Sequence, residues 1–462
     1  MMPRFIRMQR AARARWRAVG CWLLIALLAV SVAGASDTTL AVLSAADLAK
    51  VISFGPWPAP AAATADSSNR VSGNPDAIDL GRRLFFDPRM SPIGYVACVS
   101  CHQPDRAWSD GKPRAHGVAD LMRNTISLAN LRLQRWYGWG GTGDSLWQQS
   151  IRPILDPREV DSNLGQVRRL FVRDPELACA YRKVFGSGAT AARSEDETVL
   201  VNVAKALAAF IETLNTARTP FDDFRDALAR NDFTAAARYP VAAARGLRVF
   251  VNAGHCADCH DGANFSDGDF HAVAPPRRDV SLAPDAGQLE GIESLRASRF
   301  NLLGRYNDGD AAVNASATRQ LRLDDRARAR IRTPSLRNVA VTAPYLHDGR
   351  AATLREAIQH GIDSPGGAEH DGKQRRTLSA REIDDLLAFL ATLTDHDGAL
   401  RPHSTAPDSP LWRQCAMAPA SLVLSDEHDR SHQIKLEADQ GLSRSLHRPV
   451  GIESGSSTID HP

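Results

Sequence analysis

Two short loops of this chain carry the same arrangement of two cysteines and a histidine. They read CVSCH at 98–102 and CADCH at 256–260. This spacing lets two thiols add to the vinyl groups of a haem while the imidazole binds the iron beneath the same ring. The residues predicted to attach and ligate two haems are the cysteines Cys98, Cys101, Cys256 and Cys259 and the proximal iron ligands His102 and His260.

Two other readings of these loops account for the residues less well. A structural zinc site made of four cysteines would leave both histidines unexplained. A thioredoxin-type cysteine pair would neither repeat nor carry a histidine. We therefore expect two c-type haems.

The segments around the loops also repeat. Residues 240–251 show the apolar pattern of residues 76–88, and each segment runs into a cysteine loop. Later segments that begin at Ser194 and Ser379 each start with a capping box and continue as amphipathic helices. Strand signals are few, and glycine, proline and aspartate fill long connections. The pattern predicts a mostly α protein whose long irregular loops surround a cofactor.

The first 35 residues contain six arginines, no acidic residue, an apolar run and a small-residue site that ends at Ala35. These features predict a secretory signal peptide. A retained membrane anchor would need about 20 apolar residues, and this run is shorter. Without those arginines the net charge of +3 becomes about −3. No basic stripe or phosphate-binding loop is present, so we expect no nucleic-acid partner. Because the apolar run is short, we also expect no stable membrane span.

Two further parts of the chain have no haem motif. Residues 36–75 form an N-terminal segment rich in proline and alanine, and residues 398–462 lack periodicity and are predicted to be a disordered tail. Cys179 and Cys415 remain outside the loops. They could pair in an oxidising compartment, although the sequence alone does not show it.

Several longer stretches resemble the bacterial dihaem cytochrome c peroxidase family, which includes MauG-like enzymes. They are LGRRLFFDPRMSPIGYVACVSCH, RNTISLANL and RTPSLRNVAVTAPYLHDGRAATL, and the resemblance spans about residues 76–396. It implies two cytochrome c-like haem domains, a peroxidatic domain at 76–235 and an electron-transfer domain at 236–397.

The resemblance also implies catalytic residues. WGGTGDSLWQQSIRPILDPRE presents Trp139, Gln149, Pro153 and Glu159 at the family's spacing. The glutamate would assist peroxide cleavage as an acid and base, and the tryptophan would relay electrons between the haems. The family usually reads WDGRA where this chain reads WGGTG, so an aspartate and an arginine are missing.

Iron and calcium ligands follow from the same resemblance. His116 matches a distal histidine that caps the peroxidatic iron, although a solvated loop histidine is an equal alternative. The position that carries the second haem's distal methionine or tyrosine is Gly361 here, and His360 is the nearest substitute. The only methionine after the second loop is Met417. The calcium ligands would be Asn124, Thr342 and Pro344.

The expected reaction is reduction of hydrogen peroxide to water. The electrons would come from a small periplasmic carrier, a cytochrome c or a cupredoxin, and the protein would lie in the periplasm as a monomer or a homodimer. A MauG-like enzyme that oxidises residues of a partner protein and a non-catalytic dihaem electron carrier are the alternatives.

Overall fold

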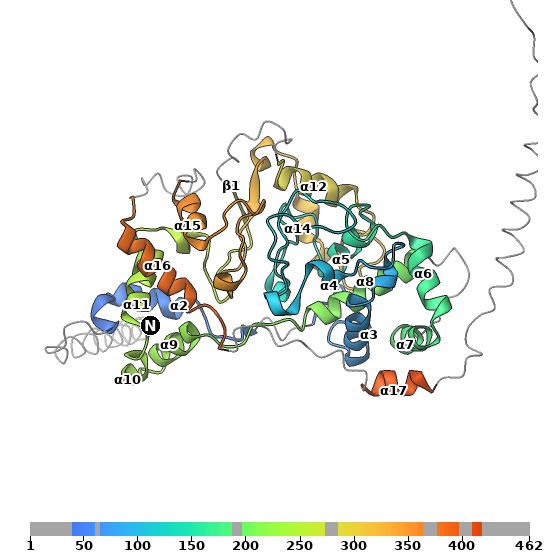
Figure 1. Cartoon of the computed structure of the whole chain (residues 1–462), viewed down its shortest axis with the longest axis horizontal. Coiled ribbons are helices and arrows are strands. Elements are labelled where there is room, and N and C mark those ends of the chain that lie inside the picture. The colour runs from blue at the N-terminus through green and yellow to red at the C-terminus, as the bar shows by residue number, and fades with distance from the viewer. Residues whose placement is uncertain are drawn as a thin grey trace, which may run out of the picture.

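The computed structural model describes residues 39–60, 65–186, 196–272, 285–363, 377–396 and 409–417. The described chain is mostly helical and forms two halves (Figure 1). Its strands are β1 (Phe270–Ala272) and β2 (Arg330–Arg332), which pair antiparallel with Phe270 opposite Arg332. The prediction of a mostly α fold with long irregular loops is confirmed.

The helices of the two halves alternate with loops. Those of one half are α3 (Pro75–Phe85), α4 (Cys98–Cys101), α5 (Leu146–Leu155), α6 (Leu164–Arg173), α7 (Pro175–Phe185), α8 (Asp196–Ile211) and α17 (Pro410–Ala416). Those of the other half are α2 (Ala45–Ser53), α9 (Pro220–Ala229), α10 (Phe233–Ala236), α11 (Val241–Val251), α15 (Leu354–Asp363) and α16 (Ala380–Ala391). Three more, α12 (Gln288–Ala297), α13 (Ala311–Asn314) and α14 (Ser316–Gln320), lie between the second haem loop and β2 in the sequence.

Each half is built on one close helix crossing. Helix α3 crosses α8 at Gly81, where a Cβ atom would lie 1.9 Å from the carbonyl oxygen of Ala206. Helix α11 crosses α16 at Gly246, where a Cβ atom would lie 1.8 Å from the carbonyl oxygen of Asp385. Only glycine permits such an approach of two backbones. The predicted internal repeat is therefore present as a repeated helix pair, in which one helix precedes a haem loop in the sequence and the other follows it.

A second repeated contact is a hydrogen bond from the backbone just after α8 or α16 to a buried asparagine. The Oδ1 atom of Asn130 accepts a hydrogen bond of 2.9 Å from the backbone N–H of Thr216. The Oδ1 atom of Asn338 accepts one of 2.9 Å from the backbone N–H of Asp395. Both asparagines are buried and have left-handed φ angles of 60° and 59°, a conformation that asparagine tolerates better than most residues. The two halves thus share their local construction as well as their helices.

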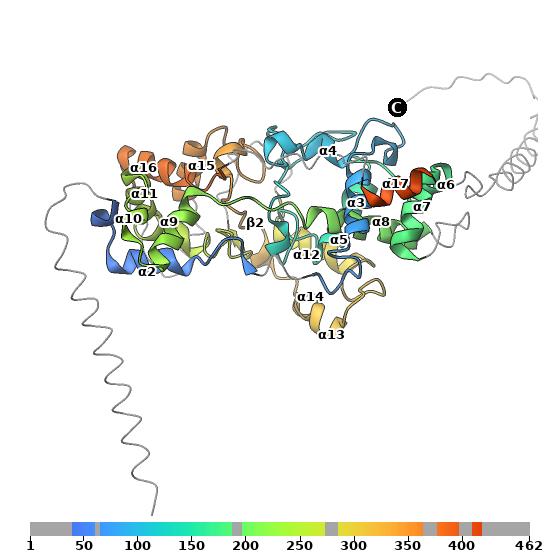
Figure 2. The ribbon, with the colours of Figure 1, turned by 90° about the horizontal axis from the view of Figure 1, so that it is seen from below.

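The predicted boundary at residue 235 does not match the packing. Phe221 and Phe224 of α9 belong to the core that also contains Phe250 of α11 and Phe389 of α16. The boundary between the two cores falls between α8 and α9, because the apolar face of α9 packs toward the second core. Figure 2 shows α9 and α10 beside α11 and α16.

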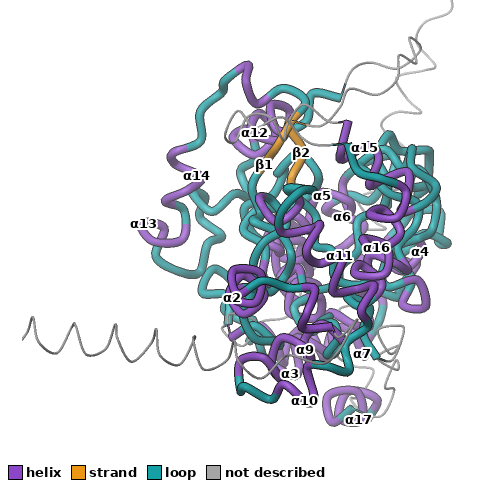
Figure 3. Tube along the Cα trace, turned by 90° about the vertical axis from the view of Figure 1, so that its left-hand side faces the viewer, coloured by secondary structure: helices purple, strands orange, loops and turns teal. Residues whose placement is uncertain are grey.

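Two segments pack in the half to which the sequence analysis did not assign them. Phe54, just after α2, stacks on Phe265 near the second haem loop, with ring centroids 4.8 Å apart. The N-terminal segment is therefore part of the second core. Conversely, Phe300 and Leu302 belong to the first core. The side-chain Oδ2 of Asp144 accepts a hydrogen bond of 2.9 Å from the backbone N–H of Leu302. Figure 3 shows the α13–α14 region standing out from the rest of the molecule.

Part of the predicted disordered tail is ordered. Residues 410–416 form α17, which lies against α7. Cys415 forms a disulfide with Cys179, and Trp412 is buried beneath the Arg83 guanidinium, whose carbon is 5.1 Å from the ring centroid. The lack of sequence periodicity was misleading, because a short helix held by a disulfide needs little periodicity of its own.

Two further expectations concern the chain as a whole. The capping box at Ser379 and Glu382 is present at the start of α16, whereas Ser194 and the predicted signal peptide lie outside the described residues. Among the helices that the structure describes, none combines the length and apolar character needed to cross a bilayer.

The helix crossings give the first prediction. Gly81→Ala and Gly246→Ala should each lower the free energy of unfolding by about 3 kcal/mol, because the added methyl group pushes two helix backbones apart. Urea unfolding of the haem-loaded protein measures this. Gly361→Ala is the matched control, since a Cβ atom there has no neighbour within 4 Å. Equal stability of all three variants would show that the crossings tolerate separation.

Candidate haem and peroxide sites

The first haem loop is a single helical turn followed by the histidine. Helix α4 runs from Cys98 to Cys101, and the N–H of His102 donates to the carbonyl oxygen of Cys98 over 3.0 Å. The Nδ1 atom of His102 lies 3.1 Å from the carbonyl oxygen of Trp108. Burial lowers the pKa of His102, so the neutral imidazole is favoured. With Nδ1 protonated toward the carbonyl, Nε2 keeps its lone pair for a metal.

The second loop repeats this geometry. The N–H of His260 donates to the carbonyl oxygen of Cys256 over 2.9 Å, and Nδ1 lies 3.0 Å from the carbonyl oxygen of Phe265. Burial also lowers the pKa of His260. Both histidines are thus oriented by a backbone carbonyl, the arrangement that fixes the tautomer of a metal-binding imidazole.

A cavity of about 370 Å³ lies at the second haem loop, and we call it the second cavity after that loop. Cys256, Cys259 and His260 form part of its wall, and apolar side chains of α15 and α16 form another. Its size falls in the range of roughly 300–1,000 Å³ that is typical of cofactor and ligand sites. Two thiols, a neutral imidazole and an apolar lining are the groups that a c-type haem requires, so these residues fit that cofactor.

Helix α15 supplies the predicted distal position. His360 and Gly361 both line the cavity that contains His260. Nothing lies within 4 Å of a Cβ atom built at Gly361, so there is room for a larger side chain. The structure contradicts the possibility that Met417 reaches this haem. Met417 follows α17, which packs on α7 in the other half, and its side chain is 83% exposed.

Trp139 lies on the wall of the second cavity although it belongs to the first half of the sequence. Its Nε1 donates to the carbonyl oxygen of Asn124 over 2.9 Å. The missing aspartate of the family motif has a steric explanation, because a Cβ atom at Gly140 would lie 2.5 Å from the carbonyl oxygen of Gly287 at the start of α12. Thr142, where the family has arginine, donates to Gln149 Oε1 over 3.0 Å.

Glu159 lies close to the first haem loop. Burial raises the pKa of the Cys98 and Cys101 thiols, and the negative charge of Glu159 adds to this in both. The Nη1 atom of Arg152 donates to Glu159 Oε1 over 2.6 Å, and 22% of the glutamate side chain is exposed. Glu159 follows α5, which ends two residues after the half-buried Pro153. The structure thus brings Glu159 to the loop of His102.

His116 is near the same loop through its backbone. Its carbonyl oxygen lies 3.6 Å from the Sγ atom of Cys101. Two and three residues later, the N–H groups of Val118 and Ala119 donate to the carbonyl oxygens of Glu159 and Arg158, each over 2.9 Å. Its imidazole is 55% exposed, and its Nδ1 lies 2.7 Å from Asp120 Oδ1. The backbone of this segment thus lies beside Cys101, while the imidazole pairs with Asp120.

The three predicted calcium ligands all line the second cavity, where the two halves meet. The amide nitrogen of Asn124 donates to the carbonyl oxygen of Lys112 over 2.7 Å, which leaves its Oδ1 as the atom for a cation. The backbone N–H of Asn124 donates to the carbonyl oxygen of His347 over 2.8 Å and so ties this segment to the chain after Pro344. Oxygen donors in this position are suited to calcium.

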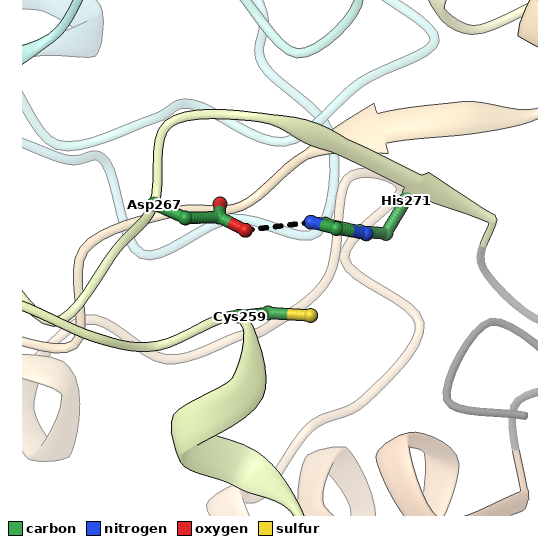
Figure 4. Close-up of side chains that lie close together, drawn as sticks. All are labelled: Cys259, Asp267 and His271. Carbon is green, nitrogen blue, oxygen red and sulfur yellow. Dashed lines mark hydrogen bonds and ion pairs between the residues drawn. The ribbon is translucent and has the colours of Figure 1, made fainter. Parts of the chain in front are cut away.

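Two residues near the second loop, Asp267 and His271, were not singled out by the sequence analysis. His271 Nε2 lies 2.7 Å from Asp267 Oδ2, with Cys259 beside them (Figure 4). Hydrogen bonds to Asp267 and Cys259 raise the pKa of His271 to about 10. The three ligand atoms lie within 4.8 Å of one another. Since Cys259 is also the second haem thiol, the cluster belongs to the haem site and is not a separate metal site.

Other cavity residues were also missed. Tyr345 and the almost fully buried Arg332 line the wall. Both lie in the stretch RTPSLRNVAVTAPYLHDGR that carried the family resemblance, so their position in that motif was the available signal. Nothing in the residue types alone indicated that they face a cofactor cavity.

These features define a dihaem c-type cytochrome. Residues 75–229 match the family model described as di-haem cytochrome c peroxidase. The chain is 32% identical over 332 residues to the methylamine utilization protein MauG of Methylorubrum extorquens, which covers 71% of this chain and 80% of that protein. It is 31% identical over 335 residues to the cytochrome-c peroxidase IdrP2 of Pseudomonas sp. strain SCT. That match covers 70% of this chain and 82% of IdrP2.

A solved structure agrees at the level of the fold. The diheme peroxidase BthA from Burkholderia thailandensis superposes with a TM-score of 0.55 at 24% identity, over 73% of this chain and 90% of that one. The chain belongs to the di-haem cytochrome c peroxidase family that includes MauG. The family implies two haems of the c type, which the two loops are built to hold.

The open space at Gly361 gives the second prediction. Gly361→Met should place a thioether in the cavity and add a sulfur ligand to the second haem. The expected result is a near-infrared sulfur-to-iron charge-transfer band in the oxidised protein and a higher midpoint potential for that haem. Gly361→Leu, of similar size but without sulfur, should produce neither change. If the two variants have the same spectrum, Gly361 does not face the iron.

Proposed function

We propose that the protein reduces hydrogen peroxide to water at the first haem, with electrons from a small periplasmic carrier such as a cytochrome c or a cupredoxin. The observation that carries this proposal is the link between Glu159 and the first haem loop: its carbonyl oxygen accepts from the N–H of Val118, two residues after His116, whose own carbonyl oxygen lies 3.6 Å from Cys101 Sγ. A pure electron carrier needs no carboxylate there. The curated relatives include cytochrome-c peroxidases, which supports the same assignment.

The chain's own groups suit proton transfer to peroxide. Arg152 occupies Oε1 of Glu159, and within the described residues Oε2 accepts no hydrogen bond. Oε2 can therefore take a proton from the near peroxide oxygen and return it to the far one, which leaves as water. The bound haem iron supplies the electrons that accompany O–O cleavage. The overall balance is one peroxide, two protons and two electrons to two waters.

Other residues would hold this arrangement. Gln149 bonds to Thr142 and so links α5 to the turn after Trp139. Pro153 lies in the last turn of α5, which ends at Leu155 just before the loop that carries Glu159. His116 would cap the first iron in a resting form after leaving Asp120, and Asn124, Thr342 and Pro344 would hold calcium between the halves. Export to the periplasm and homodimer formation belong to the same proposal.

A second function has one observation in its favour. Trp139 offers an oxidisable indole on the wall of the second cavity, and the MauG relative shares 32% identity with this chain. A MauG-like role would use this indole to oxidise residues of a partner protein at a distance. Steady turnover of peroxide with a reduced cytochrome c or cupredoxin, in the absence of any protein substrate, distinguishes the first function from the second.

The third prediction tests Glu159. Glu159→Gln keeps the shape of the side chain but removes the transferable proton, so peroxide turnover should fall by roughly 10²–10⁴-fold with both haem spectra preserved. Stopped-flow and steady-state assays with a reduced donor measure this. Glu293→Gln, on the exposed face of α12, is the control and should retain full activity. A loss of about tenfold or less at Glu159 would make it a structural carboxylate.

The fourth prediction tests Trp139. Trp139→Phe preserves a ring of similar shape but removes the readily oxidised indole, so donor-dependent turnover should fall by roughly tenfold or more while the haem spectra persist. Trp136→Phe is the control, because Trp136 is buried in a separate apolar cluster with Phe270 and Leu295 and does not line the cavity. Equal rates for both variants would exclude an electron path through Trp139.

A further inference from the structure

A buried arginine, Arg332, lines the second cavity, and the described residues provide no acidic partner for it. Arg332 ends β2, lines the cavity, and is 1% exposed. Among the described residues, no carboxylate oxygen lies within 4.0 Å of its guanidinium nitrogens. Burial lowers the pKa of Arg332 to about 10, so the side chain remains charged at neutral pH. A buried charge of this kind is costly unless it is compensated.

The hydrogen bonds of Arg332 all go to neutral groups. Nε donates to the carbonyl oxygen of Gly138 over 3.1 Å, and Nη1 donates to Gln134 Oε1 over 2.7 Å and to the carbonyl oxygen of Thr333 over 3.4 Å. Nη2 makes no hydrogen bond within the part of the chain that the structure describes. These bonds hold the planar guanidinium in one orientation without neutralising its charge.

A second arginine on the same cavity shows the contrast. Arg337 is 5% exposed and donates from Nη1 and Nη2 to the two oxygens of Asp222, over 3.0 and 2.8 Å. Its charge is therefore compensated inside the protein. The two arginines are five positions apart and line one cavity. Within the described residues, only Arg337 of this pair has a carboxylate beside its guanidinium.

We propose that Arg332 binds a propionate carboxylate of the haem attached at Cys256 and Cys259. A haem carries two propionates, and guanidinium is well matched to a carboxylate in a low-dielectric site. The proposal rests on haem occupancy of the second loop and not on peroxide reduction. The propionate would supply the negative charge that the described residues do not place beside the Arg332 guanidinium.

Arg332 would then also position the relay segment. Its backbone N–H donates to the carbonyl oxygen of Trp139 over 2.9 Å, in addition to the bond from Nε to Gly138. One residue thus connects the haem edge to the backbone that carries the indole. Arg332 acts here as a positioning residue, since it contacts the cofactor's carboxylate and the relay backbone but no substrate.

The test is a redox titration of the haem-loaded full chain together with resonance Raman spectroscopy. Removing a positive charge beside the haem favours the oxidised form, so Arg332→Gln should lower one of the two midpoint potentials and shift the propionate bending modes of that haem. Arg328→Gln is the control for net charge, because its side chain is 60% exposed. It should change neither quantity.

Arg332→Lys keeps the proposal testable if the glutamine variant does not fold. Lysine retains the charge but not the planar donor set, so the midpoint potential should stay near the wild-type value while the propionate modes shift. Unchanged propionate modes in either folded variant would overturn the proposal. An unchanged potential in folded Arg332→Gln would also overturn it. Neither the midpoint potential nor the propionate modes depend on peroxide turnover. A failure of the proposed peroxidase reaction would therefore leave this test of Arg332 unaffected.

Discussion

The structure depends on the contact of two helix backbones, made once in each half. At Gly81 and Gly246 the absence of a side chain lets α3 and α11 approach the carbonyl groups of α8 and α16 directly. Each approach places the helix before a haem loop directly against the helix that follows that loop in the sequence. The proximal histidines are then oriented by the carbonyls of Trp108 and Phe265. The orientation of both imidazoles is thus set by backbone carbonyls.

The two halves are not independent domains joined by a linker. Helix α2 and Phe54 contribute to the second core from the N-terminal side, and Phe300 and Leu302 contribute to the first core from a segment between the second loop and β2. Trp139 comes from the first half and lines the second cavity. Such exchanges restrict rotation of one half against the other, which suits electron transfer because its rate depends on a fixed separation between the redox centres.

The sequence predicted the features that depend on local chemistry. The loops around His102 and His260, the helical pattern around Gly81 and the capping box at Ser379 each depend on neighbouring residues. Contacts between distant segments were not predictable in this way. The assignment of Phe221 to the second core and of Phe54 beside Phe265 depends on tertiary packing, which a local pattern does not record.

The same reasoning applies to the sites. Glu159 and Trp139 were found through the spacing of a family motif, and the structure places them at the first loop and at the second cavity. Arg332 was not singled out, although it begins the stretch RTPSLRNVAVTAPYLHDGRAATL that carries the family resemblance. Its burial, and the absence of an acidic neighbour among the described residues, appear only once β2, the turn at Gly138 and the cavity are assembled.

The disulfide between Cys179 and Cys415 has a consequence for how the protein matures. The chain contains four haem-loop thiols that must stay reduced until each haem is attached, and one cysteine pair that must be oxidised. Cys179 precedes its partner by 236 residues, so Cys256 and Cys259 are synthesised between them. Until Cys415 arrives, any oxidant that acts on Cys179 can join it to a haem thiol instead, by ordinary thiol–disulfide exchange. Production of active protein thus requires haem attachment to outpace non-native disulfide formation, and the yield should depend on the ratio of haem supply to oxidising capacity.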